Sequence, residues 1–85
     1  MITKTNFQML KELQKDFRPK EKGFLSEKEV SVIKETLCLE ERDVLSLRNL
    51  RDFTVLLLSN KGALDMMSGI THVIDLEIFN KGGEV

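Results

Sequence analysis

The chain has 85 residues, a formal net charge of −1, and only one Cys, one His and one Pro. This length allows one domain with a small core, and 41% apolar with 32% charged residues is typical of a folded globular protein rather than a disordered one. A single Cys excludes an internal disulfide framework and any Cys-rich zinc site.

Two features of the chain indicate its compartment. The sequence lacks a secretory signal, which would consist of a positively charged start, an apolar stretch and a small-residue cleavage site. The longest apolar run, Val55–Leu58, is far shorter than the about 20 residues of a membrane-spanning helix. We therefore expect a cytoplasmic protein that makes no contact with a membrane.

The first helix is predicted over residues 5–17. Thr5 and Gln8 fit a capping box, in which a hydroxyl and an amide satisfy backbone groups that the first turn leaves without partners. Apolar residues recur at the spacings of three and four that are typical of an amphipathic helix: Phe7, Leu10, Leu13 and Phe17. Pro19 and Gly23 then indicate a linker, because proline cannot continue a helix.

The second helix is predicted over residues 26–37. Ser26 and Glu29 form another capping box, and Leu25 before the cap can pack on Val30 as a hydrophobic staple. The apolar stripe of this helix ends near Cys38, because acidic residues occupy the positions that would continue it. A new helix is therefore expected to begin near residue 39.

The third helix is predicted over residues 40–59, with acidic residues in its first turn, where they favour the positive end of the helix dipole: Glu40, Glu41 and Asp43. Because neither Gly nor Pro occurs between Phe24 and Lys61, one long helix over residues 26–59 is the alternative. From Phe53 to Leu58 the helix is apolar on nearly every side, which predicts burial on every side. A small monomer has few ways to surround such a segment, so we expect a homodimer to complete the fold.

The fourth helix is predicted over residues 62–80, with Ser59 or Asn60 as its cap. Its apolar residues fit a helical stripe: Ala63, Met66, Met67, Ile70, Val73, Ile74 and Ile78. Residues 73–79 also alternate in the way that a strand does, which leaves a strand as the alternative there. The whole pattern predicts an all-α fold, a small antiparallel bundle of three to four helices within residues 1–80.

Residues 81–85 are predicted to form a disordered C-terminal tail. The segment Lys81–Glu84 can be encoded by codons that spell a strong bacterial ribosome-binding sequence. This reading predicts a second gene close behind, as in the compact genomes of bacterial phages and mobile elements. On this hypothesis residues 81–85 are retained because their codons form the ribosome-binding sequence, and the residues themselves have no role in the protein.

The chain carries no recognisable reactive constellation. No glycine-rich phosphate loop or metalloprotease motif occurs, and the sequence neighbours of Cys38 include no base that could activate its thiol. His72 shares a helical face with Asp65 and Asp75, but one imidazole and two carboxylates without a known spacing are weak evidence for a metal. We therefore expect no enzyme activity, no cofactor and no metal.

What remains is apolar helix surface in excess of what a small bundle buries. The sequence predicts a non-enzymatic protein–protein interaction module, a regulator or inhibitor that occludes a partner protein through an apolar helical face. The expected contact residues lie on the third and fourth helices: Val55, Leu56, Met66, Met67 and Ile70.

The alternative function is that of a small DNA-binding transcriptional regulator with a helix-turn-helix-like arrangement. Its two helices would lie within residues 27–58, and Arg42, Arg48 and Arg51 would supply positive charge. Six acids against three bases between Phe24 and Leu45, and the net charge of −1, count against binding to phosphates. Nucleic acid is therefore the disfavoured partner.

Overall fold

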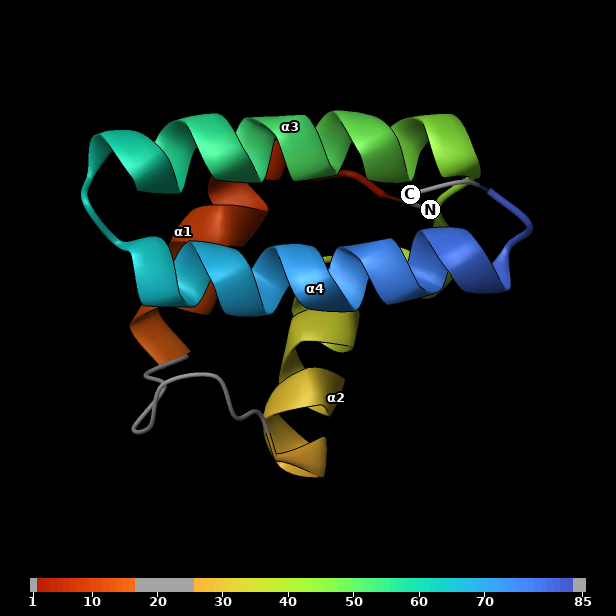
Figure 1. Ribbon diagram of the computed structural model, residues 1–85, viewed down its shortest axis with the longest axis horizontal. Helices are drawn as coiled ribbons and strands as arrows, with labels where there is room; N and C mark the ends of the chain where they lie inside the picture. Colours follow the sequence, from red (N-terminus) through yellow and green to blue (C-terminus); the bar gives the residue numbers. More distant parts are fainter. Residues whose placement is uncertain (1, 17–25, 84–85) are drawn as a thin grey trace.

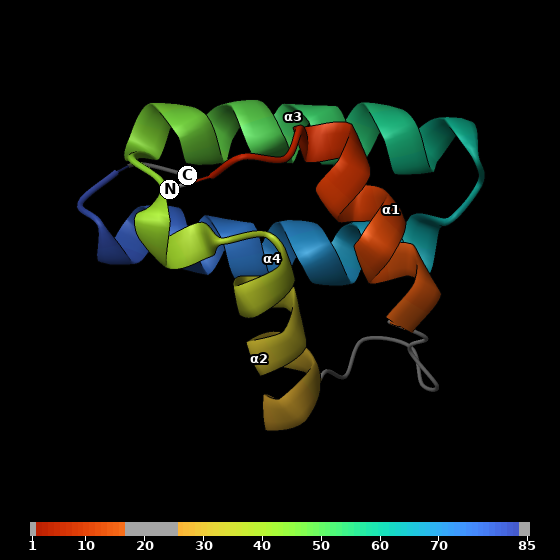
Figure 2. The same cartoon turned by 180° about the vertical axis from the view of Figure 1, so that it is seen from behind.

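The computed structural model describes residues 2–16 and 26–83, and within them all regular secondary structure is helical. The elements in chain order are α1 (Asn6–Asp16), α2 (Glu27–Thr36), the short 3₁₀ helix η1 (Leu39–Glu41), α3 (Val44–Asn60) and α4 (Leu64–Asn80). The prediction of an all-α fold is confirmed. Helices α3 and α4 lie side by side and antiparallel (Figure 1), and Figure 2 shows α1 and α2 packed across one side of this pair.

The first two helices begin where their capping boxes predict. In α1 the Thr5 N–H donates to the Gln8 side-chain oxygen at 2.9 Å, and the Gln8 N–H donates to the Thr5 hydroxyl at 3.1 Å. In α2 the reciprocal bonds between Ser26 and Glu29 measure 3.1 and 3.2 Å. Phe17 and the staple residue Leu25 lie outside the described residues.

The helical conformation is interrupted between α2 and α3, so the alternative of one long helix over residues 26–59 is wrong. Cys38 adopts the left-handed conformation with φ of 53°, which a continuous helix does not allow. Asp43 is extended and accepts the Ser46 N–H at 2.8 Å, which makes it the N-cap of α3. Glu40 and Glu41 therefore lie in η1 rather than in the first turn of α3, where they were expected.

The connection between α3 and α4 also differs from the expectation. Helix α3 continues through Asn60, so neither Ser59 nor Asn60 caps α4, whose N-cap is Ala63 without a side-chain bond. Gly62, at φ of +72°, turns the chain, and the Ala63 N–H donates to the Leu58 carbonyl at 2.9 Å.

Residues 73–79 are helical, which makes the strand alternative wrong. They lie within α4, and their buried members recur at helical spacing rather than at every second position: Val73, Ile74, Glu77 and Ile78. A strand here would have had to pair with another strand, whereas this segment packs against α3 and α2.

The core forms within a single chain. Every helix contributes to it, and its members are at most 2% exposed: Met9, Leu10, Leu13, Ile33, Leu37, Leu39, Leu47, Leu50, Leu58, Ile70, Val73, Ile74 and Ile78. The segment 53–58 is not buried on every side in this chain, since Leu58 lies in the core, Phe53 and Leu57 are partly buried, and Leu56 is 65% exposed.

The residues directly after α4 make hydrogen bonds back to the helix and to the segment before α3. The Gly83 N–H returns to the Ile78 carbonyl at 2.9 Å, and Gly82 takes φ of +84°, as the last turn of a helix often requires. The Lys81 ammonium donates to the carbonyl of Glu40 at 2.8 Å and to that of Arg42. The expectation of a disordered tail over residues 81–85 stays a prediction: residues 81–83 make the hydrogen bonds given above, and residues 84 and 85 lie outside the described part.

Candidate interaction surface

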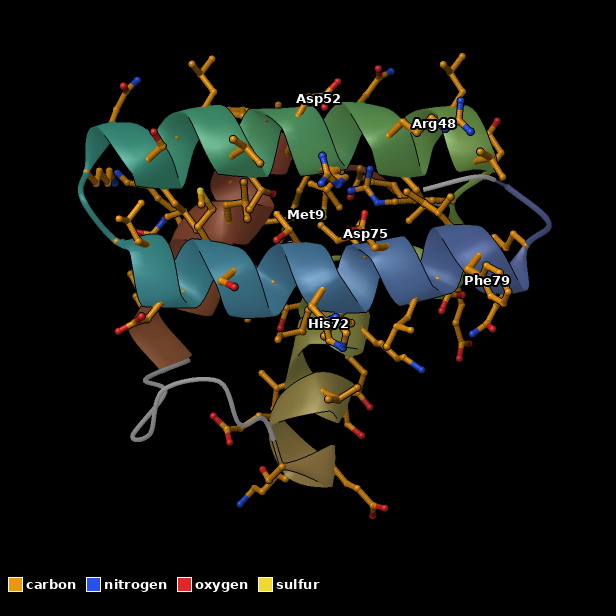
Figure 3. All side chains as sticks on the ribbon, viewed as in Figure 1. Met9, Arg48, Asp52, His72, Asp75 and Phe79 are labelled. Atoms are coloured by element: carbon orange, nitrogen blue, oxygen red, sulfur yellow. The ribbon has the colours of Figure 1, made fainter. Side chains whose placement is uncertain are left out.

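A group of exposed side chains lies on the side of α4 that faces away from the core. Phe79 is 70% exposed and Leu76 is 50% exposed, whereas the other large apolar residues of α4 from position 70 onward are buried: Ile70, Val73, Ile74 and Ile78. Residues three or four apart are neighbours on a helix surface, so His72, Leu76 and Phe79 form one continuous group, which we call the α4 patch. In Figure 3, His72 and Phe79 are drawn in front of α4 along its lower edge, His72 near the middle of the helix and Phe79 near its C-terminal end.

The α4 patch follows from helical periodicity. The buried residues of α4 occupy one side of the helix, and Leu76 and Phe79 fall on the other. Leu64, at the N-terminal end of the same helix, is a further exposed apolar residue, at 57%. Apolar side chains that are exposed and neighbours on one helix, as Leu76 and Phe79 are, can form part of an interaction surface.

His72 is exposed and belongs to the α4 patch rather than to a cluster with carboxylates. Asp75, one of the two acids expected beside it, instead accepts a hydrogen bond from Arg51 Nε of α3 at 2.6 Å. Among the residues that the structure describes, no group of three or more His, Cys, Asp and Glu side chains is placed to hold a metal ion.

The five contact residues expected from the sequence do not share one surface. Leu56 is exposed on α3, and Val55 is half-buried. Met66 and Met67 are half-buried and pack against the core. Ile70 is fully buried, so it has no surface to offer a partner, because its helical position points it at the core.

A second exposed line of residues runs along α3. Leu45 is 68% and Leu56 is 65% exposed, and two polar residues lie between them. We call this line the α3 stripe: Leu45, Asn49, Asp52 and Leu56, all exposed. It lies opposite the buried side of α3, and Figure 3 shows Asp52 at the edge of α3 that is turned away from α4.

The arginines expected on a nucleic-acid-binding helix have different roles. Arg42 is only 5% exposed, and burial lowers the pKa of its guanidinium, an effect that an electrostatic interaction with the neighbouring Cys38 opposes. Arg51 is engaged by Asp75, and Arg48 is exposed on α3. The three side chains therefore do not act as one basic surface.

One cleft of about 370 Å³ lies where the N-terminal segment and α1 meet the end of α2. Its walls carry both signs of charge, and Lys4, one of its two lysines, forms an ion pair with Glu12. Cys38 borders the cleft, and its thiol donates to the Glu35 carbonyl at 3.8 Å. The mixed charges give a charged ligand little net attraction to this cleft.

Comparisons with protein families, with curated proteins and with solved structures found no match. Within the described residues, no helix has the length and apolar character that crossing a membrane requires.

Proposed function

We propose that this protein is a small non-enzymatic interaction module that binds another protein through the α4 patch. The observation that carries the proposal is Phe79, an aromatic side chain that is 70% exposed one helical turn from the half-exposed Leu76. Aromatic residues are enriched among the few side chains that contribute most of the energy of protein–protein interfaces.

The mode of binding we propose is occlusion. A single helical face can lie in an apolar groove of a partner, with anchors at spacings of three, four and seven residues. Leu76 and Phe79 supply apolar anchors at this spacing, and His72 adds a polar group at the edge. Such a module regulates or inhibits its partner by covering a surface that the partner needs, and we place this activity in the cytoplasm.

The DNA-binding alternative has less support. A helix that reads DNA needs basic side chains that reach phosphates, and Arg42 is buried while Arg51 is engaged by Asp75. The exposed surface of α3 also carries Asp52, which repels phosphates. We therefore retain DNA only as an outcome that the experiments below can detect.

The proposal is tested by photo-crosslinking in the native host. A photoreactive phenylalanine analogue at position 79 is expected to form a crosslink to one distinct protein. The same analogue at Lys28, which is exposed on α2, is the matched control and is expected to miss that protein. Identical products from both positions, or none from position 79, would overturn the proposal.

A second measurement separates the two functions. The purified protein is mixed with random duplex DNA at low salt in a gel-shift assay. We expect no retardation. Retardation that weakens as salt increases would promote the DNA-binding alternative over the proposed one, since phosphate contacts are strongly salt-dependent.

A further inference from the structure

The cleft beside α1 has a charge balance that discriminates between classes of ligand. Among the described residues its charged lining consists of two lysines and two glutamates, which cancel: Lys4, Lys15, Glu12 and Glu35. An ion with one sign of charge gains little from such a site, whereas a molecule that carries both signs can place each charge against an opposite one. The cleft therefore favours a zwitterion over an anion or a cation.

The four charges of the cleft are not equivalent. Lys4 and Glu12 form an ion pair with each other. Lys15 in the last turn of α1 and Glu35 near the end of α2 are both exposed. Within the part of the chain that the structure describes, neither of them has a hydrogen bond or an ion pair, with the other or with a third group. Two different helices thus present one unpaired positive and one unpaired negative charge to the same cleft.

Part of the cleft wall is apolar. Met9 belongs to the core and Ile2 packs against it, and both border the cleft. Cys38 adds a further small apolar surface to the lining. The volume of about 370 Å³ is near the lower end of the range for small-molecule sites. These features fit a small zwitterion that also carries an aliphatic group.

We propose that this cleft binds an amino acid with an aliphatic side chain. The carboxylate of the ligand faces Lys15, its ammonium faces Glu35, and its side chain lies against Ile2 and Met9. Glu35 is the last residue but one of α2, where the helix dipole also favours a positive charge. The cleft shares no residue with the α4 patch, so this inference does not depend on the proposed function.

Titration of the full chain, followed by nuclear magnetic resonance, tests the proposal with three probes that share one side chain. At about pH 6, L-leucine carries both charges, L-leucinamide only the ammonium and N-acetyl-L-leucine only the carboxylate. Leucine is expected to bind with a Kd of about 0.1–1 mM and to shift the amide signals of Met9 and Cys38. Each single-charge analogue is expected to bind about three- to fivefold more weakly. Equal binding of the three probes, shifts that spare the cleft, or no binding of leucine at about 10 mM would overturn the proposal.

Substitutions at three exposed positions test the orientation of the ligand without disturbing the core. Lys15→Gln is expected to make leucine bind no better than leucinamide, while leucine still binds better than N-acetylleucine. Glu35→Gln is expected to remove the preference over N-acetylleucine and to retain the preference over leucinamide. Lys28→Gln on α2, outside the cleft, is the matched control and is expected to retain both preferences. The opposite pattern for Lys15 and Glu35, or a preference lost in the control, would contradict the proposal.

Glycine tests the apolar wall, because it is a zwitterion without a side chain. It leaves Ile2 and Met9 uncovered and is expected to bind at least about tenfold more weakly than leucine. Glycine that binds as tightly as leucine would contradict the aliphatic specificity. The two proposals can also fail separately: leucine binding without a crosslink from position 79 removes only the proposed function, and a crosslink without leucine binding removes only the ligand site.

Discussion

The Nε atom of Arg42 donates a hydrogen bond to the Leu37 carbonyl at 2.8 Å, and this bond joins the start of the α3 segment to the end of α2. The same guanidinium donates to Ser46 in α3 and to Asn6 in α1, each at 3.0 Å. One buried cation thus connects three helices. Its acceptors are neutral dipoles, and the end of α2 is where a helix dipole favours a positive charge.

The first prediction concerns this buried guanidinium. Arg42→Ala is expected to lower the free energy of unfolding by about 2–4 kcal/mol, because the buried Leu37 carbonyl would lose its donor and the partly buried Asn6 side chain would lose its partner. Arg42→Lys is expected to recover little, since an ammonium cannot present the forked donor geometry of a guanidinium. Urea denaturation followed by circular dichroism measures both.

A control variant makes this prediction specific. Lys28→Ala removes a cation of similar length from an exposed position on α2 and is expected to change stability by less than about 0.5 kcal/mol. Equal losses for Arg42→Ala and Lys28→Ala would contradict the role given to Arg42.

The second prediction concerns three consecutive leucines that have different environments. Leu58 has no exposed surface, Leu57 is partly buried and Leu56 is 65% exposed. Leu58→Ala is expected to cost about 2–5 kcal/mol through lost burial and a cavity, and Leu56→Ala less than about 0.5 kcal/mol. Leu57→Ala should fall between them. Similar losses at positions 56 and 58 would mean that α3 is rotated from the orientation described above.

Most of the fold could be predicted from local signals. Capping boxes placed the starts of α1 and α2, and apolar periodicity identified α3 and α4, because these patterns act within one helical turn. The break at Cys38 was also visible, since acidic residues interrupt the stripe there. The backbone conformation at this break could not be predicted, because a left-handed residue followed by a 3₁₀ turn leaves no distinctive residue pattern here.

The candidate surface was harder to predict, because it depends on which side of each helix the others cover. Met66 and Met67 were chosen for their residue type, yet both pack against the core. Leu76 and Phe79 were missed, although a helical projection of residues 64–80 places them away from Ile70. Arg42 was assigned to a basic surface because its contact with Asn6, 36 positions earlier, has no local signal.

The third prediction concerns the ion pair between α3 and α4. Arg51 Nε and Asp75 Oδ1 are 2.6 Å apart, and the two side chains are 39% and 22% exposed. A double-mutant cycle with Arg51→Ala and Asp75→Ala is expected to give a coupling free energy of about 0.5–1 kcal/mol, reduced at high salt because the pair is partly solvated. A coupling free energy of zero at low salt would show that the attraction between Arg51 and Asp75 does not contribute to stability.

The last prediction compares two glycines that differ in what surrounds them. Gly62 has a positive φ of +72°, but a methyl group there would meet nothing within 4 Å, so Gly62→Ala is expected to cost about 1 kcal/mol of backbone strain. Gly62→Asn should cost less, because asparagine tolerates the left-handed region.

At Gly83 an added Cβ would lie 2.7 Å from Ile78 Cγ2 and 2.9 Å from Val44 Cγ1. Gly83→Ala is therefore expected to cost about 1–3 kcal/mol through overpacking, and no polar residue there should rescue it. Thermal unfolding of the three variants measures the difference, and a neutral Gly83→Ala would mean that the residues after α4 do not pack on α3.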